Sequence, residues 1–200
     1  MTETLGIFGG TFDPPHLGHL ILAAEALSQL ELTRVLWVLT PQSPLKLGQA
    51  LTALPHRLEM LKRALGENPG FELSTLEFER PAPHYTIDTL RLLRERFPAA
   101  QLVLLIGGDS LRDLPAWGQP EAIIDLLAAF GVMRRPGDQI DLSALEARFP
   151  GIQAKVRFVE APQLEIAAST IRQRIASGGH FRYYLAPAVY EYIQQNQLYR

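Results

Sequence analysis

The chain has 200 residues, of which 47% are hydrophobic and 20% are charged, and its formal net charge is −2. These values are typical of a globular protein with one sizeable core, and they exclude a strong positive field that would draw the chain to nucleic acid or to anionic membranes. The sequence contains no cysteine, which excludes disulfides and thiolate metal sites. We expect neither a secretory leader nor a membrane span, because apolar runs near the required length of roughly 20 residues are missing. The expectation is a cytoplasmic protein with one domain over residues 1–200 and a helical subregion at about 165–200.

Residues 5–20, with the sequence LGIFGGTFDPPHLGHL, predict a buried strand, a glycine-rich turn and a helix. We expect the strand at Leu5–Phe8 and a helix that continues to Leu30. Gly9 and Gly10 carry no Cβ, so an anionic ligand can approach their backbone closely. The first turn of the helix offers free N–H groups and the positive end of a dipole, which bind phosphate. This stretch therefore predicts a phosphate site.

Two histidines follow the turn with the spacing H-x-G-H. His16 and His19 are three residues apart, so they are expected to share one helix face at the mouth of the phosphate site. A single histidine at a helix start is more often a cap or a surface residue, but the pair behind two glycines is a far more specific pattern. Gly18 lies between them, although glycine costs a helix about 1 kcal/mol relative to alanine. We expect Gly18 to let another group lie flat against the helix.

A second apolar run, Val35–Leu39, predicts a strand that is buried on both faces, with Trp37 in the core. A loop follows over residues 40–52, at the sheet edge where open α/β sheets bind ligands. Lys46 in this loop is either a solvated lysine or a phosphate contact. The spacing of leucines over Pro55–Leu65 then predicts a helix.

The next unit is an expected strand over Phe71–Phe78, a proline-rich connector and a helix that ends at Phe97. Thr86 is the expected N-cap of this helix. Backbone N–H groups at a helix start bind a carboxylate as they bind a phosphate. Tyr85 either packs under the loop or takes part in such a site, and His84 is expected at the surface.

The expected strand Gln101–Gly107 repeats the pattern of the first, because paired glycines and a polar residue follow it. Asp109 either caps the next helix or accepts a hydrogen bond from the hydroxyls of a nucleotide. Trp117 and Gly118 lie in a loop without apolar periodicity, so this tryptophan is not an obvious core residue. Its flat ring is suited to stacking on a cationic heteroaromatic group such as a pyridinium.

The last third of the chain contributes two further sets of polar residues. Arg134 and Arg135 follow an expected strand at the ligand-binding edge; arginines at a strand end usually face solvent, but at this edge a guanidinium also suits a polyphosphate. Ser169 is the expected N-cap of a helix that carries Arg172 one turn later, a combination that predicts an anion site. The other expected elements are helices at Glu121–Leu127, Asp141–Phe149 and Ala188–Gln195 and strands at Ala129–Met133 and Val156–Val159. Together the elements predict an α/β fold, a Rossmann-like doubly wound sheet that is mostly parallel, with a C-terminal helical cap.

The run Gly9-Gly10-Thr11-Phe12-Asp13-Pro14 with His16-Leu17-Gly18-His19 resembles the signature of the nucleotidyltransferase superfamily with the H-x-G-H motif. Over nearly the whole chain, the closer resemblance is to the bacterial nicotinate-nucleotide adenylyltransferases. The resemblance implies an enzyme of NAD biosynthesis that transfers AMP from ATP to nicotinate mononucleotide and releases pyrophosphate. The family pattern Ile-Ser-Ser-Thr-x-x-Arg is only partly kept, because Ala167 and Ala168 stand where serines are usual.

The resemblance assigns roles to particular residues. It implies His16, His19 and Arg172 as catalytic residues. The residues implied for ATP and phosphate are Gly9, Gly10, Thr11, Phe12, Gly18, Gly107, Asp109, Arg135, Ser169 and Thr170. Those implied for nicotinate mononucleotide are Lys46, Tyr85, Thr86, Trp117 and Gly118.

The expected partners are ATP and nicotinate mononucleotide, with Mg²⁺ held mainly by phosphates and water rather than by a protein cage. Neither a nucleic-acid nor a membrane partner is expected, and a homo-oligomer is possible. Two alternatives stay open at this point. One is a phosphopantetheine adenylyltransferase, although the chain has His16 where that family usually has threonine. The other is a nucleotide-binding regulator with an impaired site.

Overall fold

A computed structural model describes residues 2–44, 48, 50–133, 140–162 and 164–200. Its centre is a sheet of six strands in the order β3-β2-β1-β4-β5-β6, and every neighbouring pair is parallel. The strands are β1 (Thr4–Gly10), β2 (Arg34–Leu39), β3 (Phe71–Ser74), β4 (Gln101–Gly107), β5 (Ala129–Met133) and β6 (Val156–Val159). This order is that of a Rossmann-like fold, in which the reversal between β1 and β4 opens a crevice at the carboxyl edge of the sheet.

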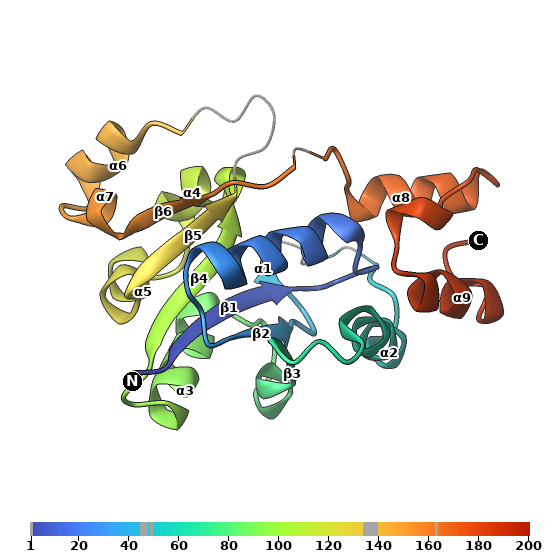
Figure 1. Cartoon of the computed structure of the whole chain (residues 1–200), viewed down its shortest axis with the longest axis horizontal. Coiled ribbons are helices and arrows are strands. Elements are labelled where there is room, and N and C mark those ends of the chain that lie inside the picture. Colours follow the sequence, from blue (N-terminus) through green and yellow to red (C-terminus); the bar gives the residue numbers. More distant parts are fainter. Residues whose placement is uncertain (1, 45–47, 49, 134–139, 163) are drawn as a thin grey trace.

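Helices cover both faces of the sheet (Figure 1). They are α1 (Leu17–Gln29), α2 (Leu54–Leu65), α3 (Thr86–Arg96), α4 (Gly108–Asp113), α5 (Pro120–Leu126), α6 (Leu142–Arg148), α7 (Ile152–Lys155), α8 (Ala168–Ala176) and α9 (Pro187–Gln195). Short 3₁₀ helices lie at Leu76–Glu79, Leu114–Ala116 and Arg182–Tyr184. None of the helices in the described ranges has the length and apolarity that a bilayer crossing requires.

Alternate strand residues divide between two cores, as the period of two in a strand requires. In β2, Trp37 is fully buried on the face that α1 and α2 cover, whereas Leu36 and Val38 belong to the opposite core. Leu104 of β4 lies in that opposite core with Leu90 of α3. The continuous apolar runs of the sequence are therefore strands that are covered on both faces, as predicted.

The C-terminal helices α8 and α9 lie together at one end of the molecule, next to α2 (Figure 1). A third hydrophobic cluster joins them: Met60 of α2 packs with Ile171 of α8 and with Val189 and Ile193 of α9. All four side chains are almost completely buried. This cluster holds the C-terminal segment against the helix that follows the loop after β2.

The expected strand over Phe71–Phe78 is only half as long as predicted. Pairing with β2 ends at Ser74, and the chain then forms a 3₁₀ helix. The reason is visible in the sequence, because the apolar spacing changes from two residues to three between Leu73 and Leu76. Leu76 and the adjacent Glu77 are both buried, which a half-exposed strand does not allow.

Candidate active site

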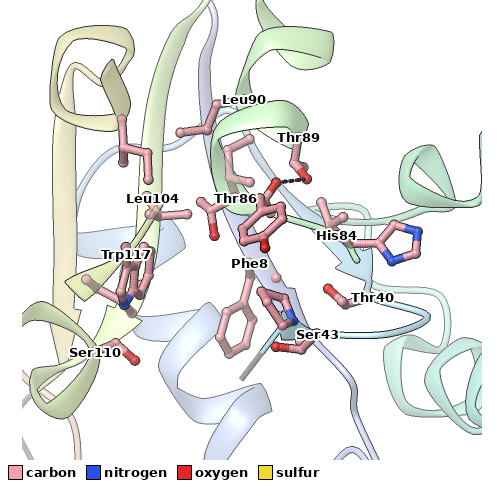
Figure 2. A pocket seen from close by; sticks show the side chains of 18 of the residues that line it. Phe8, Thr40, Ser43, His84, Thr86, Thr89, Leu90, Leu104, Ser110 and Trp117 are labelled. Atoms are coloured by element: carbon pink, nitrogen blue, oxygen red, sulfur yellow. Dashed lines mark hydrogen bonds between the residues drawn. The ribbon is translucent and has the colours of Figure 1, made fainter. Parts of the chain in front are cut away.

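A cavity of about 440 Å³ opens where β1, β2 and β4 end (Figure 2). Its position at the reversal of the strand order is the usual place for a ligand in a sheet of this type. Both glycine junctions contribute to its wall, one after β1 and one after β4. Eight of the residues predicted for the site line it: Gly9, Gly10, Thr11, Tyr85, Thr86, Gly107, Trp117 and Gly118.

Trp117 and the start of α3 form two walls of this cavity (Figure 2). Trp117 is partly exposed, and its buried part packs against the core beneath α3 and α5. Tyr85 is the N-cap residue of α3 and 40% of it is exposed, and its ring lies beside Gly118. Thr86 is the first helical residue rather than the N-cap that we expected. A flat ring and the free N–H groups of a helix start therefore face one space.

His84 is buried, in contrast to the surface position that was predicted. Only 5% of it is exposed, and its ring nitrogens lie 3.1 Å from the carbonyl oxygen of Gln42 and 3.2 Å from that of Arg80. Its backbone N–H also donates to Gln42. These contacts tie the loop after β2 to the segment that begins α3. His84 therefore fixes the position of Tyr85 and Thr86.

Glu77 is a cavity residue that sequence reasoning missed. It lines the cavity, yet only 4% of it is exposed. Thr89 Oγ1 donates a hydrogen bond to Oε1, and Oε2 has no hydrogen-bond partner among the described residues. A glutamate in an apparent strand gives no signal of burial, because charged residues there usually face solvent.

The two histidines meet at the start of α1. Their rings are stacked, with centroids 3.6 Å apart and an interplanar angle of 23°. His16 is the N-cap residue, and its backbone N–H donates to Nδ1 of His19 at 3.2 Å. Because Nδ1 of His19 accepts this bond, the proton of the neutral ring is on Nε2. His19 can therefore cap the helix with one nitrogen and donate to an anion with the other.

His19 also connects the helix start to the cavity. Its ring packs edge-on against Phe8 and Phe12, with centroid separations of 5.8 and 5.2 Å. Phe8 lines the cavity, whereas neither His16 nor His19 belongs to the residues described as lining it. The histidines thus lie beside the cavity, next to the glycine turn that lines its rim.

The glycines of the two junctions serve different purposes. A Cβ on Gly9 would meet nothing within 4 Å, so its backbone is open to a ligand as predicted. A Cβ on Gly10 would lie 3.0 Å from the Phe12 ring, which is buried in the core. Phe12 therefore packs in the core, and its side chain does not face a ligand. Gly107 leaves room for Asp109, which lies in the first turn of α4 without capping it.

Gly18 leaves room for the ring of His16. A Cβ at this position would lie 3.2 Å from His16 Nδ1 and 3.3 Å from Cε1. The group that lies flat against the helix, which the sequence left unidentified, is thus the His16 ring. Ile166, from the segment before α8, approaches the same point at 3.8 Å.

We expect Gly18→Ala to lower kcat by roughly tenfold, because the added methyl displaces the His16 ring. The free energy of unfolding should change by less than about 1 kcal/mol, since the better helix propensity of alanine offsets the crowding. Steady-state kinetics and urea unfolding measure the two effects. Ser28→Ala, an exposed position of the same helix, serves as the control with unchanged kinetics. A Gly18→Ala variant with the kcat of the wild type would contradict this role.

Arg172 of α8 reaches the turn after β1. Its Nη1 donates to the carbonyl oxygen of Asp13 at 2.7 Å, a contact that spans 159 residues. The helix begins two residues earlier than predicted, with Ala167 at the N-cap, so Ser169 is not the cap. Ser169 and Thr170 are exposed in the first turn. The structure thus brings Arg172 to the turn that leads to the histidines, and it leaves both hydroxyl residues at the surface.

A buried arginine that the sequence analysis did not single out supports the same turn. Arg57 of α2 is 2% exposed, and it donates to the carbonyl oxygens of Thr11, Thr40, Pro41 and Thr52 at 2.7–3.1 Å. Burial lowers the pKa of Arg57, and the nearby charge of Asp13 opposes this shift. Charged residues on an amphipathic helix usually face solvent, but Arg57 does not. It instead joins the loops after β1 and β2.

Two predicted phosphate contacts, Lys46 and Arg135, lie outside the described residues. Their roles stay predictions. Apart from the exposed Ser169 and Thr170, the predicted site residues in the described part of the chain form two neighbouring groups. One surrounds the cavity between α3 and the ends of β1 and β4, and the other gathers at the start of α1.

Comparisons with known proteins agree with this arrangement. The model of the cytidylyltransferase-like family matches residues 7–174. The chain is 48% identical over 196 residues to a probable nicotinate-nucleotide adenylyltransferase of Thermomicrobium roseum, and the match covers 98% of this chain and 91% of the relative. It is 38% identical over 197 residues to the nicotinate-nucleotide adenylyltransferase of Bacillus subtilis, with 98% of both chains covered.

Solved structures show the same fold. The nicotinic acid mononucleotide adenylyltransferase of Plasmodium falciparum, complexed with NaAD, superposes with a TM-score of 0.82 at 22% identity, over 98% of this chain and 97% of that one. The cytidylyltransferase-like model spans most of this chain, and the sequence relatives cover nearly all of it. The chain therefore belongs to the nicotinate-nucleotide adenylyltransferases, within the cytidylyltransferase-like family.

Proposed function

We propose that this protein transfers AMP from ATP to nicotinate mononucleotide, which gives deamido-NAD and pyrophosphate. The single observation that carries the proposal is the stacked pair of His16 and His19 beside the cavity at the reversal of the strand order. Relatives that are 38–48% identical over nearly the whole chain carry the name of this activity. The reaction makes the enzyme a nucleotidyltransferase of NAD biosynthesis.

The chemistry needs no general base. The nucleophile is the phosphate of nicotinate mononucleotide, whose second pKa is about 6, so it is mostly ionised near neutral pH. The bond that forms joins this phosphate to the α-phosphorus of ATP, and the bond that breaks releases pyrophosphate. The site must therefore place the two phosphates in line and offset the negative charge that develops on the leaving group.

His19 and Arg172 are the groups we assign to this charge. Nε2 of His19 carries a proton that can be donated to a phosphate oxygen, because Nδ1 accepts from the backbone of His16. Arg172 brings a guanidinium to the same turn through its bond to Asp13. The backbone N–H groups of the first turn of α1 add further donors. ATP enters as its complex with Mg²⁺, and we propose that phosphates and water supply most of the ligands of this ion.

The cavity wall at α3 is assigned to the pyridine end of the acceptor. Trp117 offers a flat face for stacking on the pyridinium ring. The N–H groups at the start of α3, next to Tyr85 and Thr86, are suited to the nicotinate carboxylate. Lys46 and Arg135 are proposed as additional phosphate contacts on the basis of the family resemblance.

Release of pyrophosphate from ATP, measured with three acceptors side by side, tests the function. We expect rapid release with nicotinate mononucleotide and much slower release with nicotinamide mononucleotide and with phosphopantetheine. Faster turnover with phosphopantetheine would assign the chain to the other adenylyltransferase. ATP binding without pyrophosphate release, whichever acceptor is present, would indicate a regulator.

We expect Trp117→Ala to raise the KM for nicotinate mononucleotide by roughly tenfold or more, because a stacked aromatic pair contributes about 0.5–1.5 kcal/mol beyond the area it buries. The KM for ATP should change little, since the protein groups that we assign to the phosphates of ATP lie at the start of α1 and not at Trp117. Trp117→Phe, which keeps a flat ring, should recover most of the affinity. Equal increases in both KM values would remove the stacking role.

A further inference from the structure

The penultimate residue of the chain reaches back to the turn that follows β1. The hydroxyl of Tyr199 donates to Oδ1 of Asp13 at 2.6 Å, although 186 residues separate them. The same hydroxyl lies 3.8 Å from Sδ of Met60 in the C-terminal cluster. α9 ends at Gln195, and the chain then turns back on itself through residues with positive φ. The C-terminal segment is therefore joined to the turn that precedes the histidines.

Asp13 connects this tyrosine to two other segments. It is 3% exposed, and its second carboxylate oxygen accepts from the backbone N–H of Thr52 at 3.1 Å. Its backbone carbonyl accepts from Nη1 of Arg172 at 2.7 Å. One buried residue thus holds the chain end, the loop before α2 and the arginine of α8. It lies three residues before His16, the N-cap of α1.

The contact between Tyr199 and Asp13 is a strong one. Burial, followed by the negative charge of Asp13, raises the pKa of Tyr199 well above its ordinary value. The phenol therefore remains a donor throughout the pH range of an enzyme assay, and a hydroxyl that donates to a carboxylate forms a charge-assisted bond. Arg57, whose carbonyl partners include Thr11 and Thr52, supplies positive charge near the same carboxylate.

We propose that Tyr199 is a positioning residue for the phosphates of ATP. Its hydroxyl holds Asp13 in place, and Asp13 in turn holds the guanidinium of Arg172 and the turn that leads to His16. Neither Tyr199 nor Asp13 belongs to the residues described as lining the cavity, so the effect should fall on ATP rather than on the pyridine. This inference rests on the proposed function, because it takes the start of α1 as the ATP phosphate site.

Tyr199→Phe tests the proposal in the full chain, because it removes the hydroxyl and keeps the ring that packs beside Met60. We expect the KM for ATP to rise by about tenfold and kcat to fall, because Arg172 and the turn before His16 lose the contact that positions them, and small misplacements of such groups have effects of this size or larger. The KM for nicotinate mononucleotide should stay unchanged. Steady-state pyrophosphate release with each substrate varied in turn gives both values.

Tyr192→Phe is the matched control. Tyr192 packs in the same C-terminal cluster, and its hydroxyl also makes a side-chain hydrogen bond, to Nδ1 of His56 at 2.8 Å. Its loss should lower the melting temperature by an amount similar to that of Tyr199→Phe and leave both KM values unchanged. If the two variants had the same kinetics, Tyr199 would be structural only, and the proposal would be overturned.

Asp13→Asn tests whether Tyr199 acts on the ATP site through Asp13. If Tyr199 acts through Asp13, the Asn variant should also raise the KM for ATP, and adding Tyr199→Phe to it should produce little further change. If the fold-increase in the KM for ATP in the double variant equalled the product of the two single increases, the two residues would act separately, and the proposal would be contradicted.

Direct binding of a non-hydrolysable ATP analogue separates this inference from the proposed function. Calorimetry should show weaker binding by Tyr199→Phe than by the wild type, with Tyr192→Phe unaffected. The same difference in binding is expected even if the wild type releases no pyrophosphate with any acceptor. That lack of release would overturn the proposed function but not the positioning role of Tyr199. Equal affinity in all three proteins would overturn the positioning role whatever the turnover.

Discussion

Replacing His19 with alanine is expected to lower kcat by a factor of about 10²–10³, the usual effect of removing one donor that stabilises transition-state charge. The reason is geometric. Nδ1 of His19 accepts from the backbone of His16, so Nε2 carries the proton that the leaving pyrophosphate requires. Pyrophosphate release at saturating substrates measures the effect. The protein should stay folded, because the half-buried ring contributes mainly a helix cap that is typically worth about 1 kcal/mol.

Two further substitutions separate the cap from the donor. His19→Asn can place an amide oxygen near the position of Nδ1, so it should keep the cap and most of the stability but remain as inactive as alanine. His19→Gln can place its amide near the position of Nε2 and should recover part of the activity. His180→Ala, at an exposed histidine of the C-terminal segment, is the control with unchanged turnover. An Asn variant that is more active than the Gln variant would contradict the role of Nε2.

The sheet could be predicted because its strands are buried on both faces. Val35–Leu39 and Gln101–Gly107 are nearly continuous apolar runs, and each is a parallel strand in the structure. The strand that begins at Phe71 was predicted too long, because the change of apolar spacing between Leu73 and Leu76 was not taken as its end; pairing with β2 stops at Ser74. The two glycine junctions could be identified because each directly follows an apolar run, one at Leu5–Phe8 and the other within Gln101–Gly107.

The contacts that hold the site together could not be predicted. Arg57 looked like an exposed residue of an amphipathic helix, and His84 looked like a polar residue of a loop. Both are buried because carbonyl oxygens from distant loops converge on them, and no local pattern carries that information. Helix starts were misplaced by one residue at Thr86 and by two at Ser169 for a related reason. A side chain that is able to cap was taken as the cap, whereas packing set the first turn.

Arg57→Met is expected to be the most destabilising of the substitutions considered, with a loss of about 3–5 kcal/mol in the free energy of unfolding, as for removal of one partner from a buried charged network. Methionine fills a similar length but donates no hydrogen bond. The carbonyl oxygens of Thr11 and Thr40 would lose a donor, and the buried carboxylate of Asp13 would lose its nearby positive charge. Equilibrium unfolding in urea measures the loss.

Lys62→Met is the matched control, because it removes the same charge from the same helix at an exposed position. Its free energy of unfolding should stay within about 0.5 kcal/mol of the wild type, as for most surface substitutions. The comparison isolates the effect of the buried guanidinium from the effect of net charge. If Arg57→Met were no less stable than Lys62→Met, the hydrogen bonds of Arg57 would not be what joins the loops after β1 and β2. The turn after β1 would then depend on Asp13 and its contacts with Tyr199 and Arg172.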